Sequence, residues 1–263
     1  GAVWADLDGN GAPDLVYSGV TNETRRIVTA LNDGRGSLTV SENNLPAVSG
    51  PVVATDFDGD DRMDLLLTET PAGLAEARIY LNSGEGTYVP GPLVATGNPI
   101  TAAGTTDING DGIPDVWLVQ ATDEIRRKRE LSGYVRTPEG FTRVLYLDST
   151  EFVGAAEPAW GDFDHDGLPD FVAPYADRLL LANGKESATN YFTVYHNRGS
   201  GRFETGGYVF PLPPNATRNP VTFVPAAADI DLDGDLDIVG FETVFKPFLN
   251  RRLEPNLPPG APT

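Results

Sequence analysis

The chain of 263 residues contains no cysteine and only two histidines. Without cysteine it has no disulfide framework, and a structural zinc site built from Cys and His is disfavoured. No apolar run approaches the ~20 residues of a membrane-spanning helix, so membrane insertion is not expected. Basic residues are scarce too: 19 Lys and Arg stand against 38 Asp and Glu, and the net charge of −19 argues against nucleic acid as a partner.

Glycine and proline, in contrast, are abundant, with 29 and 22 residues. This composition favours many short strands and turns over long helices. The acidic residues are distributed unevenly, because 20 of the 24 Asp fall in five stretches of nine residues. These stretches, here loops one to five with positions 1 to 9, are DLDGNGAPD (6–14), DFDGDDRMD (56–64), DINGDGIPD (107–115), DFDHDGLPD (162–170) and DIDLDGDLD (229–237).

The residues around the loops repeat as well. A small residue precedes each loop, and a short apolar run such as LVYSG or LLLTE follows it, which indicates strands. A later turn with Asn and Gly, as in YLNSGEGTY (80–88), indicates a hairpin. Each repeat of about fifty residues is thus predicted to be a four-stranded antiparallel sheet that must stack on its neighbours. We expect an all-β fold, a β-propeller of five such blades, with a linear solenoid as the alternative.

Side-chain oxygens occupy positions 1, 3, 5 and 9 of every loop. Several anionic oxygens on a tight loop are typical of Ca²⁺ sites, and Mg²⁺ is the alternative. A glycine at position 6 allows the sharp turn, and Asp61 takes that place in loop two. An EF-hand is excluded because position 12 carries no Glu. The predicted side-chain ligands are Asp6, Asp8, Asn10, Asp14, Asp56, Asp58, Asp60, Asp64, Asp107, Asn109, Asp111, Asp115, Asp162, Asp164, Asp166, Asp170, Asp229, Asp231, Asp233 and Asp237.

The loop, the apolar strand after it and the YLNSGEG turn together resemble the FG-GAP/VCBS repeats of integrin-α-like propellers, over residues 1–253. The resemblance implies up to five Ca²⁺ ions and a further backbone carbonyl ligand at position 7, from Ala12, Arg62, Ile113, Leu168 and Asp235. Asn10 and Asn109 replace Asp, so we expect weaker binding in loops one and three. Relatives often have seven blades, which leaves part of a larger propeller as an alternative. The Pro-rich tail, 254–263, is expected to be a linker to neighbouring domains of a larger chain.

The resemblance also implies a function: an extracellular module, secreted or on the cell surface, that binds a glycan or a surface protein, as in lectins and adhesion proteins. Because one constellation recurs five times and no catalytic arrangement is visible, we do not expect an enzyme. The alternatives are an accessory or catalytic domain of a polysaccharide-degrading enzyme, and a structural spacer.

A few other residues invite a functional interpretation. For Trp4, Trp117 and Trp160, packing between blades is favoured over sugar binding. His165 and His196 have no evident carboxylate partner in the sequence, which favours structural roles. The basic stretch 125–130 is expected to be solvated, although it could bind a sulfated glycan. The insertion 177–190 is predicted to be either a recognition loop or a tolerated surface extension.

Overall fold

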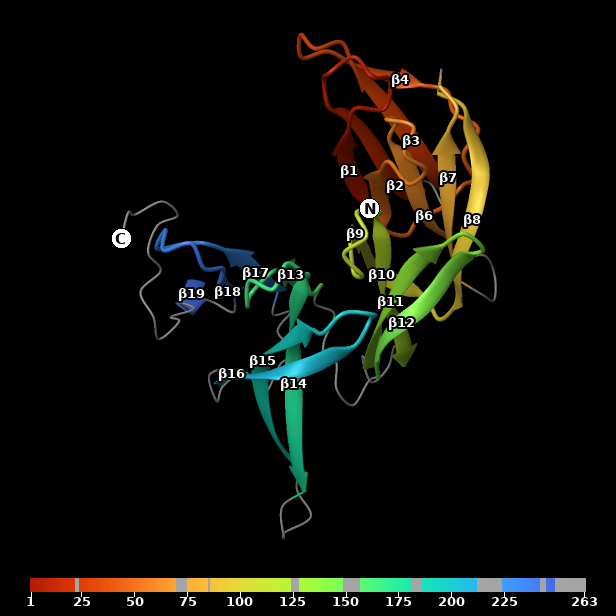
Figure 1. Ribbon diagram of the computed structural model, residues 1–263. Coiled ribbons are helices and arrows are strands. Elements are labelled where there is room, and N and C mark those ends of the chain that lie inside the picture. Colours follow the sequence, from red (N-terminus) through yellow and green to blue (C-terminus); the bar gives the residue numbers. More distant parts are fainter. Residues whose placement is uncertain are drawn as a thin grey trace. The chain divides into compact units, whose positions relative to one another are not determined.

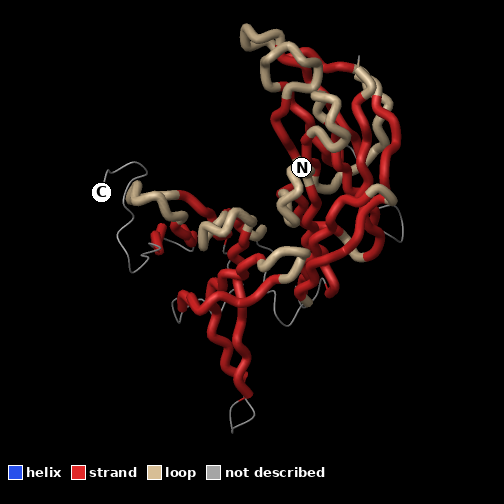
Figure 2. Tube along the Cα trace, in the orientation of Figure 1, coloured by secondary structure: helices blue, strands red, loops and turns tan. Residues whose placement is uncertain are grey.

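A computed structural model describes residues 1–21, 24–69, 75–84, 86–123, 128–148, 157–180, 186–211, 224–241 and 245–248 (Figure 1). All regular secondary structure in these residues is β-strand, as Figure 2 shows. Within the same residues, no helix has the length and apolarity to cross a membrane.

The strands form five antiparallel sheets, one for each acidic loop, in which spatial order follows chain order. Sheet one contains β1 (Ala2–Ala5), β2 (Asp14–Thr21), β3 (Thr24–Asn32) and β4 (Leu38–Ser41). Sheet two contains β5 (Val52–Thr55), β6 (Asp64–Glu69), β7 (Ala75–Asn82) and β8 (Tyr88–Gly97). Sheet three contains β9 (Ile100–Thr106), β10 (Asp115–Asp123), β11 (Lys128–Thr137) and β12 (Gly140–Leu147).

Sheet four contains β13 (Ala159–Gly161), β14 (Asp170–Leu180), β15 (Glu186–Asn197) and β16 (Phe203–Pro211), and sheet five contains β17 (Val224–Ala228), β18 (Asp237–Phe241) and β19 (Phe245–Phe248). Four sheets therefore have the predicted four strands, whereas sheet five has three within the described residues. The predicted linker at 254–263 lies outside the described residues.

Each acidic loop joins the first and second strands of its sheet. The first strand ends at the small residue before the loop, and that residue pairs with the Asp at position 9, which begins the second strand. The pairs are Ala5 with Asp14, Thr55 with Asp64, Thr106 with Asp115, Gly161 with Asp170 and Ala228 with Asp237. This strand–loop–strand arrangement confirms the strand assignment made from the apolar runs.

The chain divides into two compact units. Unit one comprises Gly1–Asp107, Asp111–Thr122 and Leu131–Tyr146, and it holds sheets one and two and most of sheet three. One core cluster joins sheets one and two through Leu7, Val16, Leu65 and Leu67, and another joins sheets two and three through Phe57, Leu66, Val116 and Leu118. Alternate residues of β6 thus face opposite neighbours, as a strand buried on both faces requires.

Unit two comprises Ile108–Gly110, Asp123–Glu130 and Leu147–Thr263, and it holds sheets four and five. Phe163, Val172 and Phe192 of sheet four form a core with Ile238 of sheet five. On the other face of sheet four, Phe171 stacks on Tyr195 with ring centroids 4.7 Å apart. The same face also holds Trp160 and Phe203, which contact Phe171.

The tryptophans differ from one another in their surroundings. Trp160 packs in the aromatic cluster of sheet four, and Trp117 is buried with its indole over Gly104, where a Cβ would lie 2.3 Å from the ring. Trp4 is 57% exposed and packs in neither core cluster of unit one, so its packing between blades stays a prediction. Within unit one, no other sheet covers the face of sheet one that carries Trp4.

Two other sequence features take a definite form. The described parts of the insertion, 177–180 and 186–190, extend β14 and β15, which stay paired from Phe171 with Tyr195 out to Leu180 with Glu186, and residues 181–185 lie outside the described residues. The basic stretch was predicted to be solvated, but Arg129 in it is buried, and at this residue the prediction is wrong. Residues 125–127 of that stretch lie outside the described residues.

Candidate metal centre

The carboxylate at position 1 is the internal acceptor of each loop. It accepts a hydrogen bond from the backbone N–H of position 6 in all five loops: Gly11 to Asp6 2.8 Å, Asp61 to Asp56 2.9 Å, Gly112 to Asp107 2.7 Å, Gly167 to Asp162 3.0 Å and Gly234 to Asp229 3.0 Å. These bonds need no long-range contact, because donor and acceptor are five residues apart. The sequence of the loop therefore determines its curvature locally.

Position 5 makes the second local bond. Its side-chain oxygen accepts from the backbone N–H of position 7 in every loop: Ala12 to Asn10 2.8 Å, Arg62 to Asp60 3.0 Å, Ile113 to Asp111 2.8 Å, Leu168 to Asp166 2.9 Å and Asp235 to Asp233 2.9 Å. Asn10 serves as well as Asp here because an amide oxygen is an equivalent acceptor.

The carboxylate at position 9 is buried and ties the loop to its sheet. In loop two, Asp64 is 0% exposed, and it accepts from Phe57 N at 2.9 Å and from Asn82 N at 2.8 Å. Asp14 and Asp170 make the same two bonds to their own loops and turns. Position 9 is therefore structural even without an ion, and each oxygen keeps a second lone pair that can face a cation.

The turn asparagine that meets position 9 was interpreted from the sequence only as a hairpin residue. Asn82 Nδ2 donates to Met63 O of its own loop at 3.2 Å and to Leu7 O of loop one at 2.9 Å. Asn197 repeats the first bond with Pro169 O and also donates to Ile108 O. In sheet three, Arg136 stands at this place, and its guanidinium donates to Phe57 O of loop two. The signal in the sequence was the recurrence of Asn in the turn after the loop, 18 residues after position 9 in sheets one and two and 27 residues after it in sheet four.

Backbone conformation also follows the loop position. Position 6 is left-handed in all five loops, as predicted, with φ of 64° at Asp61 and 83–95° at the four glycines. Position 4 is left-handed too, which the sequence analysis did not predict although Gly9, Gly59 and Gly110 stand there. In loops four and five the same conformation is imposed on His165 and Leu232, at φ of 59° and 62°.

Together these bonds bring acidic oxygens into small groups. In four loops, three acidic side chains each offer an oxygen within 4.8 Å of the others: Asp6, Asp8 and Asp14; Asp56, Asp58 and Asp64; Asp162, Asp164 and Asp166; Asp229, Asp231 and Asp237. Loops one and three each have three acidic side chains, but in loop three the amide of Asn109 stands at position 3, where the groups of the other four loops have a carboxylate. An all-oxygen donor set of this size fits Ca²⁺, whereas the carbonyl ligands expected at position 7 stay a prediction.

Electrostatics explains why such groups favour a cation. Burial raises the pKa of Asp64, and the nearby Asp58 and Asp60 raise it further against the two backbone N–H bonds, which lower it. Desolvation likewise raises the pKa of Asp231, and Asp233 and Asp237 add to that. Like charges at this separation destabilise one another, so a divalent cation between them removes the repulsion.

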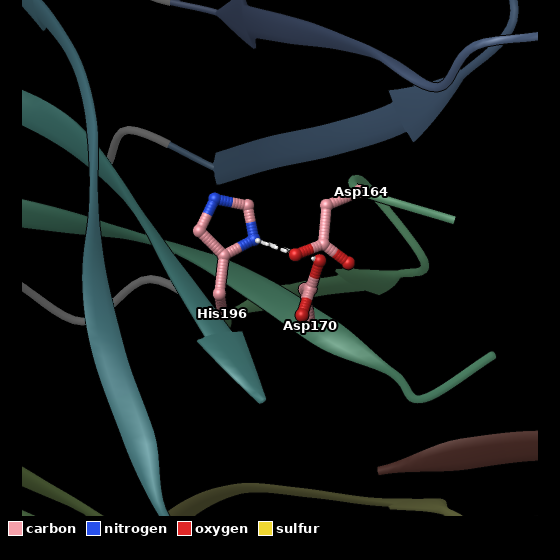
Figure 3. Close-up of side chains that lie close together, drawn as sticks. All are labelled: Asp164, Asp170 and His196. Atoms are coloured by element: carbon pink, nitrogen blue, oxygen red, sulfur yellow. Dashed lines mark hydrogen bonds and ion pairs between the residues drawn. The ribbon is translucent and has the colours of Figure 1, made fainter. Parts of the chain in front are cut away.

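Both histidines contact carboxylates, contrary to the prediction from the sequence. His165 Nε2 lies 2.8 Å from Asp235 Oδ1, which joins loop four to loop five within unit two. His196 Nδ1 lies 3.1 Å from Asp170 Oδ2 and 3.3 Å from Asp164 Oδ2 (Figure 3). The sequence did not reveal these contacts because the partners are 70 and 26 residues apart.

Comparison with known families adds to this geometry. The FG-GAP-like repeat matches three times, over residues 6–67, 56–118 and 176–240. The chain belongs to the FG-GAP-like repeat family. The matches cover loops one, two, three and five and more than half of the chain, which confirms the resemblance stated from the motifs. A search of curated proteins finds no match to the chain as a whole.

Proposed function

We propose that the FG-GAP-like sheets are the blades of an extracellular, calcium-stabilised β-propeller that binds a glycan or a surface protein. One observation carries the proposal: the same loop geometry recurs five times, with equivalent carboxylates held by equivalent backbone bonds. A catalytic site is normally a single constellation, whereas a repeated one suits a structural or multivalent role.

The packing of successive sheets supports a ring of blades. The first strands of sheets one, two and three contact one another in chain order, and those of sheets four and five do the same within unit two. Radial stacking places such inner strands side by side near an axis. Small-angle scattering in calcium tests this part of the proposal, since a closed ring has a smaller radius of gyration than a linear stack.

The ions account for much of the unusual charge. Five divalent cations carry ten positive charges, which leaves a net charge of about −9 from the formal −19. The remaining surface is mildly acidic, which suits a neutral glycan or a basic protein surface better than a polyanion.

A glycan array probed with the calcium-loaded chain tests the binding role, and a parallel array with chelator tests its dependence on the ion. Binding that is lost with chelator and restored by calcium supports the proposal. Turnover of a polysaccharide by the chain alone would replace it by an enzymatic function. Calcium binding with no glycan or cell-surface ligand would leave a spacer as the function.

A further inference from the structure

Loop four differs from loops one, two and three in the side chain that faces it from the third strand of its sheet. The residue before the turn asparagine is Leu31 in sheet one and Leu81 in sheet two, and both pack with the apolar cores. In sheet three the equivalent residue is Val135, which is buried. In sheet four it is His196, whose side chain is 13% exposed.

The orientation of this imidazole is set by its surroundings. On β16, Gly206 lies beneath the ring, and a Cβ there would be 2.5 Å from Nε2. The ring therefore packs over a residue without a side chain and turns Nδ1 toward Asp164 and Asp170 (Figure 3). Asp170 is held in place by Phe163 N and Asn197 N, so the three ligand atoms lie within 4.8 Å of one another before any ion binds.

We propose that loop four selects a first-row transition ion, such as Mn²⁺, Co²⁺ or Zn²⁺, over Ca²⁺, with His196 Nδ1, Asp164 and Asp170 as its ligands. This rests on the proposed role of the acidic loops in binding metal. Imidazole nitrogen favours transition ions, whereas Ca²⁺ prefers oxygen alone. Among the described residues, the other groups of three metal-ligating side chains contain carboxylates only.

Arg198 competes with any cation for the carboxylates of loop four. Its guanidinium Nη1 lies 2.7 Å from Asp164 Oδ2 and 3.7 Å from Asp166 Oδ2, where a cation bound between these carboxylates would compete with it. Asp33 and Ser83 occupy the equivalent place in sheets one and two. Because Arg198 Nε also lies 3.5 Å from Glu204 Oε2, a more strongly held ion can displace the guanidinium toward Glu204.

The test is a Co²⁺ titration of the whole chain kept saturated with millimolar Ca²⁺, followed by visible absorption of the bound cobalt. We expect one Co²⁺ per molecule with the absorption of a mixed nitrogen and oxygen site. His196→Leu, which restores the residue of sheets one and two, should weaken Co²⁺ at least tenfold and leave calcium binding by the other loops unchanged. His196→Gln keeps a polar side chain but lacks the imidazole, and it should lose Co²⁺ equally.

Gly206→Ala provides a second variant that touches no ligand. Its Cβ displaces the ring, so Co²⁺ should weaken about tenfold while circular dichroism shows an intact sheet fold. The proposal is overturned if the wild-type chain binds no Co²⁺ in millimolar calcium, or if His196→Leu binds it as tightly. Calcium stoichiometry, measured separately, tests the proposed function: a chain that binds one Co²⁺ but no Ca²⁺ refutes that function and leaves this site standing.

Discussion

Sheets one and two share the loop, the strand pattern and the turn, but they differ in what covers one of their faces. Leu65 and Tyr80 of sheet two are buried against sheet one. The equivalent face of sheet one has Trp4 and Tyr17 at 57% and 39% exposure. The sequence repeat thus specifies the same sheet twice, and the neighbouring sheet decides whether a given apolar side chain is buried.

The loops differ much less between the two sheets. Asp6 and Asp56 accept the same backbone bonds, and Asp14 and Asp64 are both 0% exposed. Within unit one, the comparison therefore separates two sources of stability: the hydrogen bonds of the loop, present in both sheets, and packing against a preceding sheet, present in sheet two and not in sheet one.

Calcium removal is expected to have the largest effect. When free Ca²⁺ is about a hundred times its Kd, each site contributes about 2.7 kcal/mol to the free energy of unfolding. Removal of Ca²⁺ from several sites by a chelator should therefore lower the melting temperature by at least about 10 °C. Because no other sheet of unit one covers the Trp4 face of sheet one, amide hydrogen exchange should rise more in β1–β4 than in β5–β8. Calcium should reverse both effects and magnesium only weakly. Equal exchange in the two sheets would show that calcium binding at the loops, and not packing between sheets, determines their stability.

Substitution of the buried leucine at the start of the second strand tests directly how much packing against the preceding sheet contributes to stability. Leu65→Ala removes a fully buried side chain and should cost about 3 kcal/mol in the free energy of unfolding. The matched Leu15→Ala change affects a partly exposed residue and should cost about 1 kcal/mol or less. Urea unfolding in saturating calcium measures both. Equal losses would mean that the first sheet is covered in solution.

The sequence predicts those parts of the structure whose hydrogen bonds join residues close together in the chain. The loops were predictable because their bonds join residues two to seven positions apart, as between Gly11 and Asp6 or Leu7 and Asp14. The strand ends were predictable for the same reason, since each loop starts and stops a strand.

Contacts between repeats were not predictable in the same way. The bond from Asn82 to Leu7 O spans 75 residues, and no local pattern reveals it. His196 occupies a position that is apolar in three other sheets, so the pattern there predicted only a strand residue. The exposure of Trp4 depends on a covering surface that its own repeat does not contain.

Substitution of the turn asparagine in sheets one and two tests the same comparison, with a smaller expected loss of stability. Asn82 and Asn32 each bond their own loop, but only Asn82 also donates to the preceding loop. Asn82→Ala should cost about 2–3 kcal/mol because it leaves Leu7 O and Met63 O without this donor, and Asn32→Ala about 1 kcal/mol. Thermal unfolding of the two variants checks the difference. If the costs were equal, the bond between loops would add nothing.

Titration of loop two in chelator has a predictable sign. Burial is the main reason that the pKa of Asp64 is raised from its ordinary value of 3.8. The folded protein therefore binds this proton more tightly than the unfolded chain does. The free energy of unfolding falls as pH rises from about 3.8 through the raised pKa. For Asp56 burial also raises the pKa, but four backbone N–H groups outweigh it and the net shift is downward. The stabilisation that ionised Asp56 gives to the fold is present above pH 3.8 and is lost as the pH falls through the lowered pKa.

Carbon-detected NMR of the two carboxyls in the chelated chain measures these shifts. We expect Asp64 to titrate above 3.8 and Asp56 below it, although both belong to one loop. Asp64→Asn should abolish the upper transition and leave the lower one. A common midpoint for both residues would contradict the distinct environments of positions 1 and 9.

Position 6 offers the smallest effect, and it exchanges a single residue between the two sheets. Gly11 stands there in loop one at φ of 85°, and Asp61 stands there in loop two at φ of 64°. A left-handed conformation costs a residue with a Cβ about 1 kcal/mol, and Asp tolerates it better than most. Asp61→Gly should therefore raise the melting temperature by about 1–2 °C, and Gly11→Asp should lower it by a similar amount. If Asp61→Gly instead lowered the temperature and Gly11→Asp raised it, the attraction between the position 6 carboxylate and the bound cation would outweigh the backbone strain.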